Sequence, residues 1–265
     1  MSNAYTLSLA RGTVIERAVL MARTLWLIPA TFVTLTLCVV LMALCTAATL
    51  GKAQNLIIHV FSLAIGRLVL TYAGIKLRIE HVGEKINRPA IYIANHSSTL
   101  DLFVILALGL PRVRYVAKHE FIYNPFFGLM GKMTGQIFIK RQDSEAAIAT
   151  LNQAYDRLRR ERLSLLFMPE GTRRVDGKIG PFKKGAFRMA MDLNCPIVPM
   201  HFIGTRRLCP GKSHVVHPGT ITVRFHPAID MRSWNSENLD ANVSELRERY
   251  IRWEQEAATV EVRRS

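Results

Sequence analysis

A histidine and an aspartate lie five residues apart in the polar stretch 95–101, NHSSTLD, which separates the apolar runs 90–94 and 102–110. An imidazole that is held by a carboxylate through one ring nitrogen can act as a general base through the other. If the first run is a strand and the second a helix, His96 leaves the carboxyl end of the strand, where open α/β sheets bind ligands. The chain contains no Gly-x-Ser-x-Gly nucleophile motif. We therefore expect that the hydroxyl deprotonated by His96 belongs to the substrate, with Asp101 orienting the ring.

The same stretch also fits a helix cap. Ser98 and Asp101 have the spacing of a capping box, in which the serine begins the helix and the carboxylate reaches back to its backbone. This interpretation accounts for two residues and leaves His96 unexplained. If it were the whole role of the stretch, the chain would be a membrane-associated lipid-binding protein without catalytic activity.

A second polar motif follows another apolar run, 163–167. Gly171 permits close approach of the backbone to a ligand, Thr172 can donate a hydrogen bond, and Arg173 can bind a phosphate as a planar fork. Together with Glu170 these residues suit an anionic head group, and the alternative is an ordinary solvated turn.

Three basic residues stand at the ends of other predicted elements. Lys140 and Arg141 end the strand-like run 136–139, and Lys183 lies just before a predicted helix at 184–193. A cation at the start of a helix is unfavourable unless an anion binds there. An isolated exposed cation is usually only solvated. The prediction that these residues bind an anion therefore depends on the other motifs.

The elements that position these motifs alternate along the chain after residue 75, which predicts one α/β domain with helices on both faces of a sheet. Short runs rich in β-branched residues are bounded by turns, and amphipathic stretches lie between them. The strands are expected at 76–81, 90–94, 113–117, 136–139, 163–167, 197–203 and 220–225, and the helices at 102–110, 144–160, 184–193 and 237–259.

The N-terminal part has a different character. Residues 24–50 carry no charge, and a second apolar stretch, 56–75, is interrupted by Arg67. About 20 apolar residues span a bilayer, whereas the apolar part of a signal peptide has roughly 7–15. Basic residues flank both ends, so a hairpin with its ends on the cytoplasmic face is favoured over a single crossing; a core hairpin of a soluble protein is the third possibility. We expect membrane-anchoring helices in 1–75 and a catalytic domain in 76–265.

Composition narrows the partners. The net charge of +15 favours anionic ones: an anionic membrane surface, phosphates or an acidic protein. The basic residues lack the aromatic interleaving of a single-strand binding surface, so nucleic acid is not expected. The four cysteines form no CxxC pair, which argues against a disulfide framework or a zinc site.

Four motifs in this order resemble those of the glycerolipid acyltransferases, the PlsC-like 1-acylglycerol-3-phosphate acyltransferases. The pair His96 and Asp101 resembles the HX4D motif of that family, and 135–141 resembles its second motif. Residues 167–173 resemble the third, usually FPEGTR, and 196–199 the fourth. Between the histidine and the aspartate, Ser-Ser-Thr departs from the commoner version that contains an aromatic residue, which leaves the acceptor lipid open.

This resemblance implies a mixed, mostly parallel sheet covered by helices, and a membrane-bound enzyme of phospholipid synthesis. His96 would deprotonate the sn-2 hydroxyl of lysophosphatidic acid, which attacks the thioester of acyl-CoA or acyl-ACP to give phosphatidic acid. No metal or bound cofactor is expected. Another lysolipid acceptor, such as lyso-ornithine lipid, and a lipid hydrolase are the alternatives. The residues expected to bind substrate are Asn95, Lys140, Arg141, Glu170, Gly171, Thr172, Arg173 and Lys183.

Overall fold

The computed structural model describes residues 14–262 except 141, 175, 212 and 214. In this part of the chain, seven strands form one sheet in the order β1-β7-β6-β2-β5-β3-β4. All neighbouring pairs are parallel except β6 and β7, so the predicted mixed, mostly parallel sheet is confirmed. The strands are β1 (Ile75–His81), β2 (Ile91–Ala94), β3 (Val113–Lys118), β4 (Ile137–Ile139), β5 (Ser164–Phe167), β6 (Ile197–Ile203) and β7 (Gly219–Phe225).

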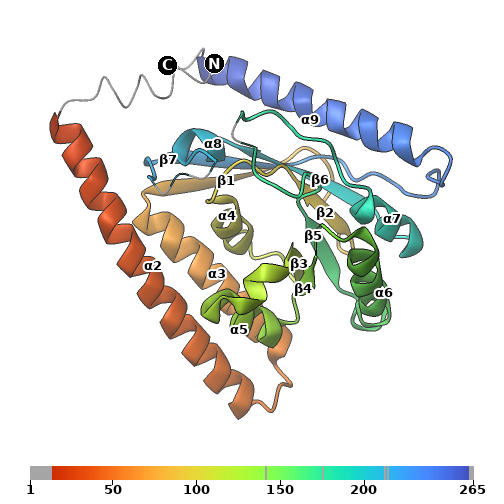
Figure 1. Cartoon of the computed structure of the whole chain (residues 1–265), viewed down its shortest axis with the longest axis horizontal. Helices are drawn as coiled ribbons and strands as arrows, with labels where there is room; N and C mark the ends of the chain where they lie inside the picture. Colours follow the sequence, from red (N-terminus) through yellow and green to blue (C-terminus); the bar gives the residue numbers. More distant parts are fainter. Residues whose placement is uncertain (1–13, 141, 175, 212, 214, 263–265) are drawn as a thin grey trace.

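Helices cover both faces of the sheet (Figure 1), because the central strands are apolar on both sides. One apolar layer joins β2, β5 and β6 to α6, α7 and α9, and the opposite layer joins the same strands to α3, α4 and α8. The helices of the domain are α4 (Asp101–Ala107), α5 (Pro125–Thr134), α6 (Ser144–Glu161), α7 (Gly185–Asp192), α8 (Thr205–Leu208) and α9 (Leu239–Val262), with a 3₁₀ turn η1 (His119–Tyr123). The sequence did not predict η1, α5 or α8.

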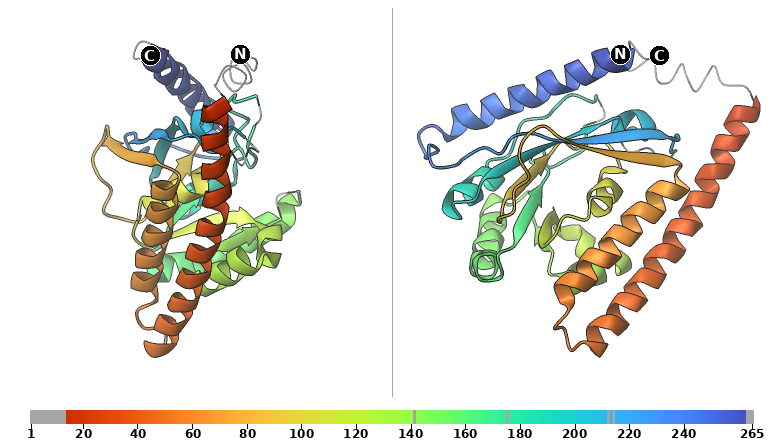
Figure 2. Two further views of the ribbon diagram at one scale, coloured as in Figure 1. Left: turned by 90° about the vertical axis from the view of Figure 1, so that its left-hand side faces the viewer. Right: turned by 180° about the vertical axis from the view of Figure 1, so that it is seen from behind.

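The N-terminal helices α2 (Val14–Ala48) and α3 (Gln54–Tyr72) run antiparallel as a hairpin (Figure 2). Both are long and apolar enough to cross a membrane, by length and composition alone. α3 packs against α4, and Gly66 permits this contact because a Cβ there would meet the backbone of Ala107. The predicted helical hairpin is present, and it packs directly on the α/β part; the boundary between residues 75 and 76 stays a prediction.

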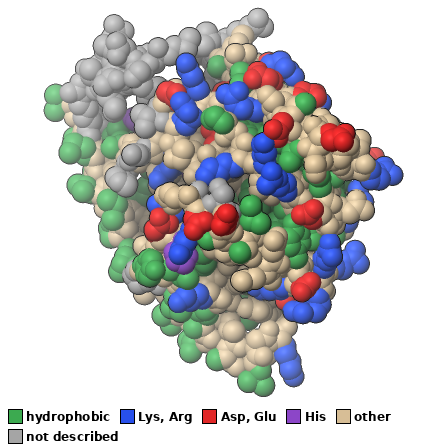
Figure 3. Space-filling view, turned by 45° about the vertical axis from the view of Figure 1, so that its right-hand side comes forward, with side chains coloured by type: hydrophobic (Ala, Val, Ile, Leu, Met, Phe, Trp, Pro, Cys, Tyr) green, Lys and Arg blue, Asp and Glu red, His purple; other side chains and the backbone are tan. Residues whose placement is uncertain are grey.

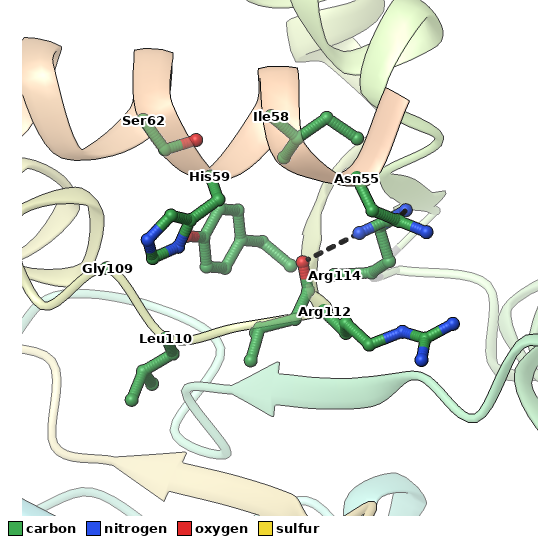
Figure 4. Close-up of a pocket in the computed structure, with 10 residues that line it drawn as sticks. Asn55, Ile58, His59, Ser62, Gly109, Leu110, Arg112 and Arg114 are labelled. Carbon is green, nitrogen blue, oxygen red and sulfur yellow. Dashed lines mark hydrogen bonds between the residues drawn. The ribbon is translucent and has the colours of Figure 1, made fainter. Parts of the chain in front are cut away.

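A polar stripe on α3 also faces protein, beside the buried apolar residues of this helix. Asn55, His59 and Ser62 line a small cavity that the segment after α4 closes (Figure 4). Asn55 Oδ1 accepts a hydrogen bond from Arg114 Nη2 at 2.7 Å. Burial lowers the pKa of Arg114 to about 10, so this buried guanidinium needs the oxygen atoms around it. The contact fastens the hairpin to β3.

Candidate active site

Three strands deliver polar residues to one edge of the sheet. β2, β5 and β6 are parallel neighbours, so their carboxyl ends lie together. His96 follows β2, Glu170 follows β5 and Thr205 follows β6. This is the ligand-binding edge of open α/β sheets, and it is where the sequence placed His96.

His96 and Asp101 form a hydrogen-bonded pair. His96 Nδ1 lies 2.8 Å from Asp101 Oδ2, and the same oxygen accepts the backbone N–H groups of Ser97 and Ser98 at 2.8 and 2.9 Å. The Asp101 side chain is fully buried, whereas that of His96 is 18% exposed. Because a carboxylate accepts from Nδ1, the neutral ring carries its proton there and offers the lone pair of Nε2.

The predicted capping box is only partly present. The Asp101 carboxylate accepts the Ser98 N–H at 2.9 Å, as predicted, but α4 begins at Asp101, so Ser98 is not the residue that starts the helix. The Ser98 hydroxyl, however, donates to Cys209 O at 2.7 Å and accepts from Leu100 N. It is drawn toward a neighbouring loop, and Leu100 is the residue that precedes the helix.

Glu170 contacts the backbone of two neighbouring turns. Its Oε1 accepts the His96 backbone N–H at 2.8 Å and its Oε2 accepts the Gly180 N–H at 2.7 Å. The residue is only 7% exposed, and burial raises the pKa of its carboxyl. Both oxygens thus accept hydrogen bonds within the protein, so Glu170 supports the turn that carries His96, and its binding of substrate stays a prediction.

Asn95 also bonds to neighbouring backbone, and its binding of substrate stays a prediction. Its Nδ2 donates to Phe202 O at 3.1 Å, and its Oδ1 accepts from Phe202 N at 2.8 Å. The side chain therefore continues the pairing of β2 with β6 beyond the last residue of β2. With 2% exposure, Asn95 fixes the strand end immediately before His96.

The turn after β5 brings most of the other predicted residues together. Arg173 Nη1 donates to Thr99 Oγ1 at 2.6 Å, which places its guanidinium beside the turn of His96. Gly171 has φ +70°, and the Lys183 side chain lies over it, because a Cβ there would come 3.2 Å from Lys183 Cε. Thr172 is exposed next to them. Their binding of substrate stays a prediction.

The second motif lies farther away. Lys140 is exposed after β4, the edge strand, and β5 and β3 separate it from β2. Strands are about 4.8 Å apart, so the distance across the sheet is roughly 14 Å. The structure therefore does not bring Lys140 to His96, and Arg141 lies outside the described residues.

Sequence reasoning missed the connection after β6, which consists of α8 and the loop that follows it and whose described residues include Gly211 and Ser213. Thr205 Oγ1 lies 3.1 Å from Ser97 Oγ, and Gly211 N donates to Ser97 O at 3.1 Å. This loop forms one wall of the site. The signal was available, because the loop begins at the carboxyl end of a predicted strand, as NHSSTLD does.

A cavity of about 510 Å³ adjoins Gly171. It lies between α6 and α7 and is lined mainly by apolar side chains, among them Leu151, Phe167, Phe182 and Met189. Lys183 is at its boundary. No sequence pattern reveals it, since its lining residues come from α6, α7 and the ends of three strands, which meet only in the fold.

Within the described ranges, no group of three or more His, Cys, Asp and Glu side chains could hold a metal ion. The expectation of a reaction without a metal or cofactor stays a prediction.

Comparison with known proteins decides the family. A family model described as Acyltransferase matches residues 77–203, which include the His96–Asp101 pair and Arg173. Over 188 residues the chain is 36% identical to a 1-acyl-sn-glycerol-3-phosphate acyltransferase of Limnanthes douglasii, covering 71% of this chain and 66% of that protein. The chain belongs to the glycerolipid acyltransferase family.

Other comparisons agree with this family. The human 1-acyl-sn-glycerol-3-phosphate acyltransferase beta is 33% identical over 156 residues, 59% of this chain and 56% of that protein. The crystal structure of PlsC from Thermotoga maritima shares the fold, with a TM-score of 0.71, 23% identity and coverage of 88% of this chain and 96% of that one. The match to the Limnanthes protein spans just under two thirds of its length.

Proposed function

We propose that this acyltransferase transfers a fatty acyl group from acyl-CoA or acyl-ACP to the sn-2 hydroxyl of 1-acylglycerol-3-phosphate, giving phosphatidic acid. The observation that carries the proposal is the bond of 2.8 Å between His96 Nδ1 and Asp101 Oδ2. It leaves Nε2 as a base at the ligand-binding edge, in a turn whose Thr99 bonds to Arg173. The names of the relatives support the choice of acceptor.

In the proposed reaction, Nε2 of His96 takes the proton of the acceptor hydroxyl as its oxygen attacks the thioester carbonyl carbon. A tetrahedral intermediate forms, the carbon–sulfur bond breaks, and the proton returns from Nε2 to the leaving thiolate. Asp101 stabilises the transient imidazolium and keeps the ring oriented. General-base catalysis of this kind contributes about 10²–10⁴ in rate.

The phosphate of the acceptor and the acyl chain of the donor each have a suitable environment near His96. Arg173 and Lys183 supply the positive charge for a phosphate, with arginine able to bind it as a fork. The cavity beside Gly171 supplies apolar walls for the acyl chain of the donor. The reacting carbonyl would then lie between the two, next to His96.

The hairpin gives the acyltransferase access to membrane lipid. α2 exposes many large apolar side chains, including Leu25, Trp26, Phe32, Leu37 and Leu44. Figure 3 shows hydrophobic side chains gathered toward the lower left, whereas charged ones dominate the opposite side. A patch of this kind marks a membrane or protein contact. We propose that the hairpin lies in the membrane, with the catalytic domain on the cytoplasmic face and basic residues near anionic lipid.

The test is an acylation assay with the full-length protein in lipid vesicles. The acceptors are 1-acylglycerol-3-phosphate, lyso-ornithine lipid, a lysophospholipid with a phosphodiester, and monoacylglycerol; the donors are labelled acyl-CoA and acyl-ACP. We expect phosphatidic acid from the first acceptor, in the presence of a chelator as well, and none from His96→Ala. Failure to acylate any acceptor, or release of free fatty acid alone, would refute the proposal.

A further inference from the structure

Thr99 makes a short contact with the arginine of the neighbouring motif. Thr99 Oγ1 accepts from Arg173 Nη1 at 2.6 Å. A hydrogen bond from a charged donor is shorter and stronger than one between neutral groups. Thr99 is three residues after His96 in the same turn, so this bond links the guanidinium directly to the segment that carries the base.

The hydroxyl of Thr99 also lies near the loop after α8. Its lone pair faces Arg173, and its proton can reach Gly211 O and Ser213 O, each 3.5 Å from Oγ1. The same loop is joined to the turn by the bond from Ser98 Oγ to Cys209 O. The loop, the threonine and the arginine thus form one chain of contacts.

The shape of the threonine side chain makes it a fixed support. A β-branched residue has few χ1 rotamers, so Oγ1 has little freedom once the backbone of the turn is set. That backbone is set by Asp101, which accepts the N–H groups of Ser97 and Ser98, and by Glu170, which accepts the N–H of His96. The groups that orient His96 therefore also determine where Arg173 lies.

We propose that Thr99 is a positioning residue for acceptor selection, which fixes the Arg173 guanidinium at a set distance from His96 Nε2. The inference rests on the proposed function. In 1-acylglycerol-3-phosphate, the reacting hydroxyl and the phosphate are on adjacent carbons, so their separation is short and nearly constant. A base and a guanidinium held at a matching separation select this acceptor over one without the phosphate, since both groups are engaged at once.

The decisive variant is Thr99→Val, which keeps the branched shape and removes the hydroxyl. We expect KM for 1-acylglycerol-3-phosphate to rise about tenfold or more, the effect of losing one hydrogen bond to a charged group, with kcat within about twofold. The ratio of kcat/KM for this acceptor to that for monoacylglycerol should fall by a similar factor. Thr99→Ser, which retains the hydroxyl, should restore both values.

A matched control and a double-mutant cycle separate positioning from general damage. Thr259→Val removes a threonine hydroxyl that bonds to Gln255 O in α9, far along the chain from the site, and should leave KM unchanged. In an Arg173→Ala background, Thr99→Val should have no further effect on KM. Thr99→Ala provides the same cycle if the valine variant does not fold.

The outcomes are distinct. If the wild type acylates 1-acylglycerol-3-phosphate but Thr99→Val keeps its KM and its preference, the inference is overturned and the proposed function stands. Additive effects of Thr99 and Arg173 would also overturn it, because independent residues do not act through each other. A wild type that is inactive toward this acceptor refutes the proposed function itself.

Discussion

Replacing Glu170 by glutamine tests whether this carboxylate supports the turn or binds the acceptor. The carboxylate accepts N–H groups from His96 and Gly180. Glutamine can accept one of them, but its NH₂ group then faces the other N–H, which is left buried without an acceptor. The substitution thus changes hydrogen bonding and charge while nearly preserving volume.

The expected magnitude follows from these two contacts. A buried N–H without an acceptor costs about 1–3 kcal/mol, and the remaining bond loses its charge assistance. Against this, glutamine needs no desolvation of a charge, the cost that raises the pKa of Glu170. We expect a net loss of about 2 kcal/mol, which lowers the melting temperature of a chain of this size by roughly 4–8 °C.

Kinetics distinguish the two roles more sharply than stability. Because the His96 backbone loses its support, Nε2 shifts relative to the acceptor hydroxyl, and a misplacement of about 1 Å costs on the order of 10²-fold in rate. We expect Glu170→Gln to lower kcat by roughly 10- to 100-fold while KM for 1-acylglycerol-3-phosphate stays within about twofold.

The measurements are thermal unfolding and steady-state kinetics on full-length protein, with Glu245→Gln as the control. Glu245 is an exposed carboxylate on α9 paired with Arg249, and its replacement should change neither quantity. A Glu170→Gln protein with normal kcat and a strongly raised KM would show that Glu170 contacts the acceptor, and the assignment made from its two hydrogen bonds would be wrong.

Three further results are expected. Asp101→Asn should lower kcat by about 10²–10⁴, since the amide cannot hold the proton on Nδ1 in the same way; near-normal turnover would exclude the pair as the base. Leu151→Phe narrows the cavity, so in competition assays the longest acyl donors should lose rate relative to short ones, and an unchanged profile would place the chain elsewhere. Burial, with smaller contributions from His201 and Arg224, lowers the pKa of His226 to about 4 from an ordinary 6.5. The unfolded state therefore binds more protons between these values, and the free energy of unfolding should fall by up to about 3 kcal/mol as pH drops from 6.5 to 4. Denaturant titrations at several pH values should show that the free energy of unfolding depends less on pH in His226→Gln than in the wild type. The same pH dependence in both proteins would contradict this.

Much of the fold could be predicted because the signals are local. The strands stand out as short apolar runs or, like β1 and β7, as segments in which apolar residues alternate with polar ones, and the observed bounds differ from the predicted ones by at most one residue at either end. α5 gave no such signal, since its segment combines glycines with apolar residues on several sides, and α8 has only four residues.

The hydrogen bonds of the site were harder to predict where they join residues that follow different strands, because such contacts depend on the order of the strands in the sheet. His96 and Asp101 could be paired because they lie in one turn, whereas Glu170 meets His96 across 74 residues of sequence. Its partner becomes visible only when β5 is placed beside β2. The same is true of Asn95 and Phe202, 107 residues apart. A side chain that looks available for substrate in the sequence is then found to be occupied by a neighbouring backbone.

The place of β1 at the edge of the sheet has a consequence for biosynthesis. β1 follows α3 directly, yet its only strand partner in the described structure is β7, with Arg224 bonded to Glu80 across 144 residues. The sheet can therefore close only after β7 has left the ribosome, and such non-local pairing is slow. The hairpin is complete by Tyr72, so on the proposed membrane association the nascent chain reaches lipid first, and the catalytic centre assembles afterwards on a chain already anchored.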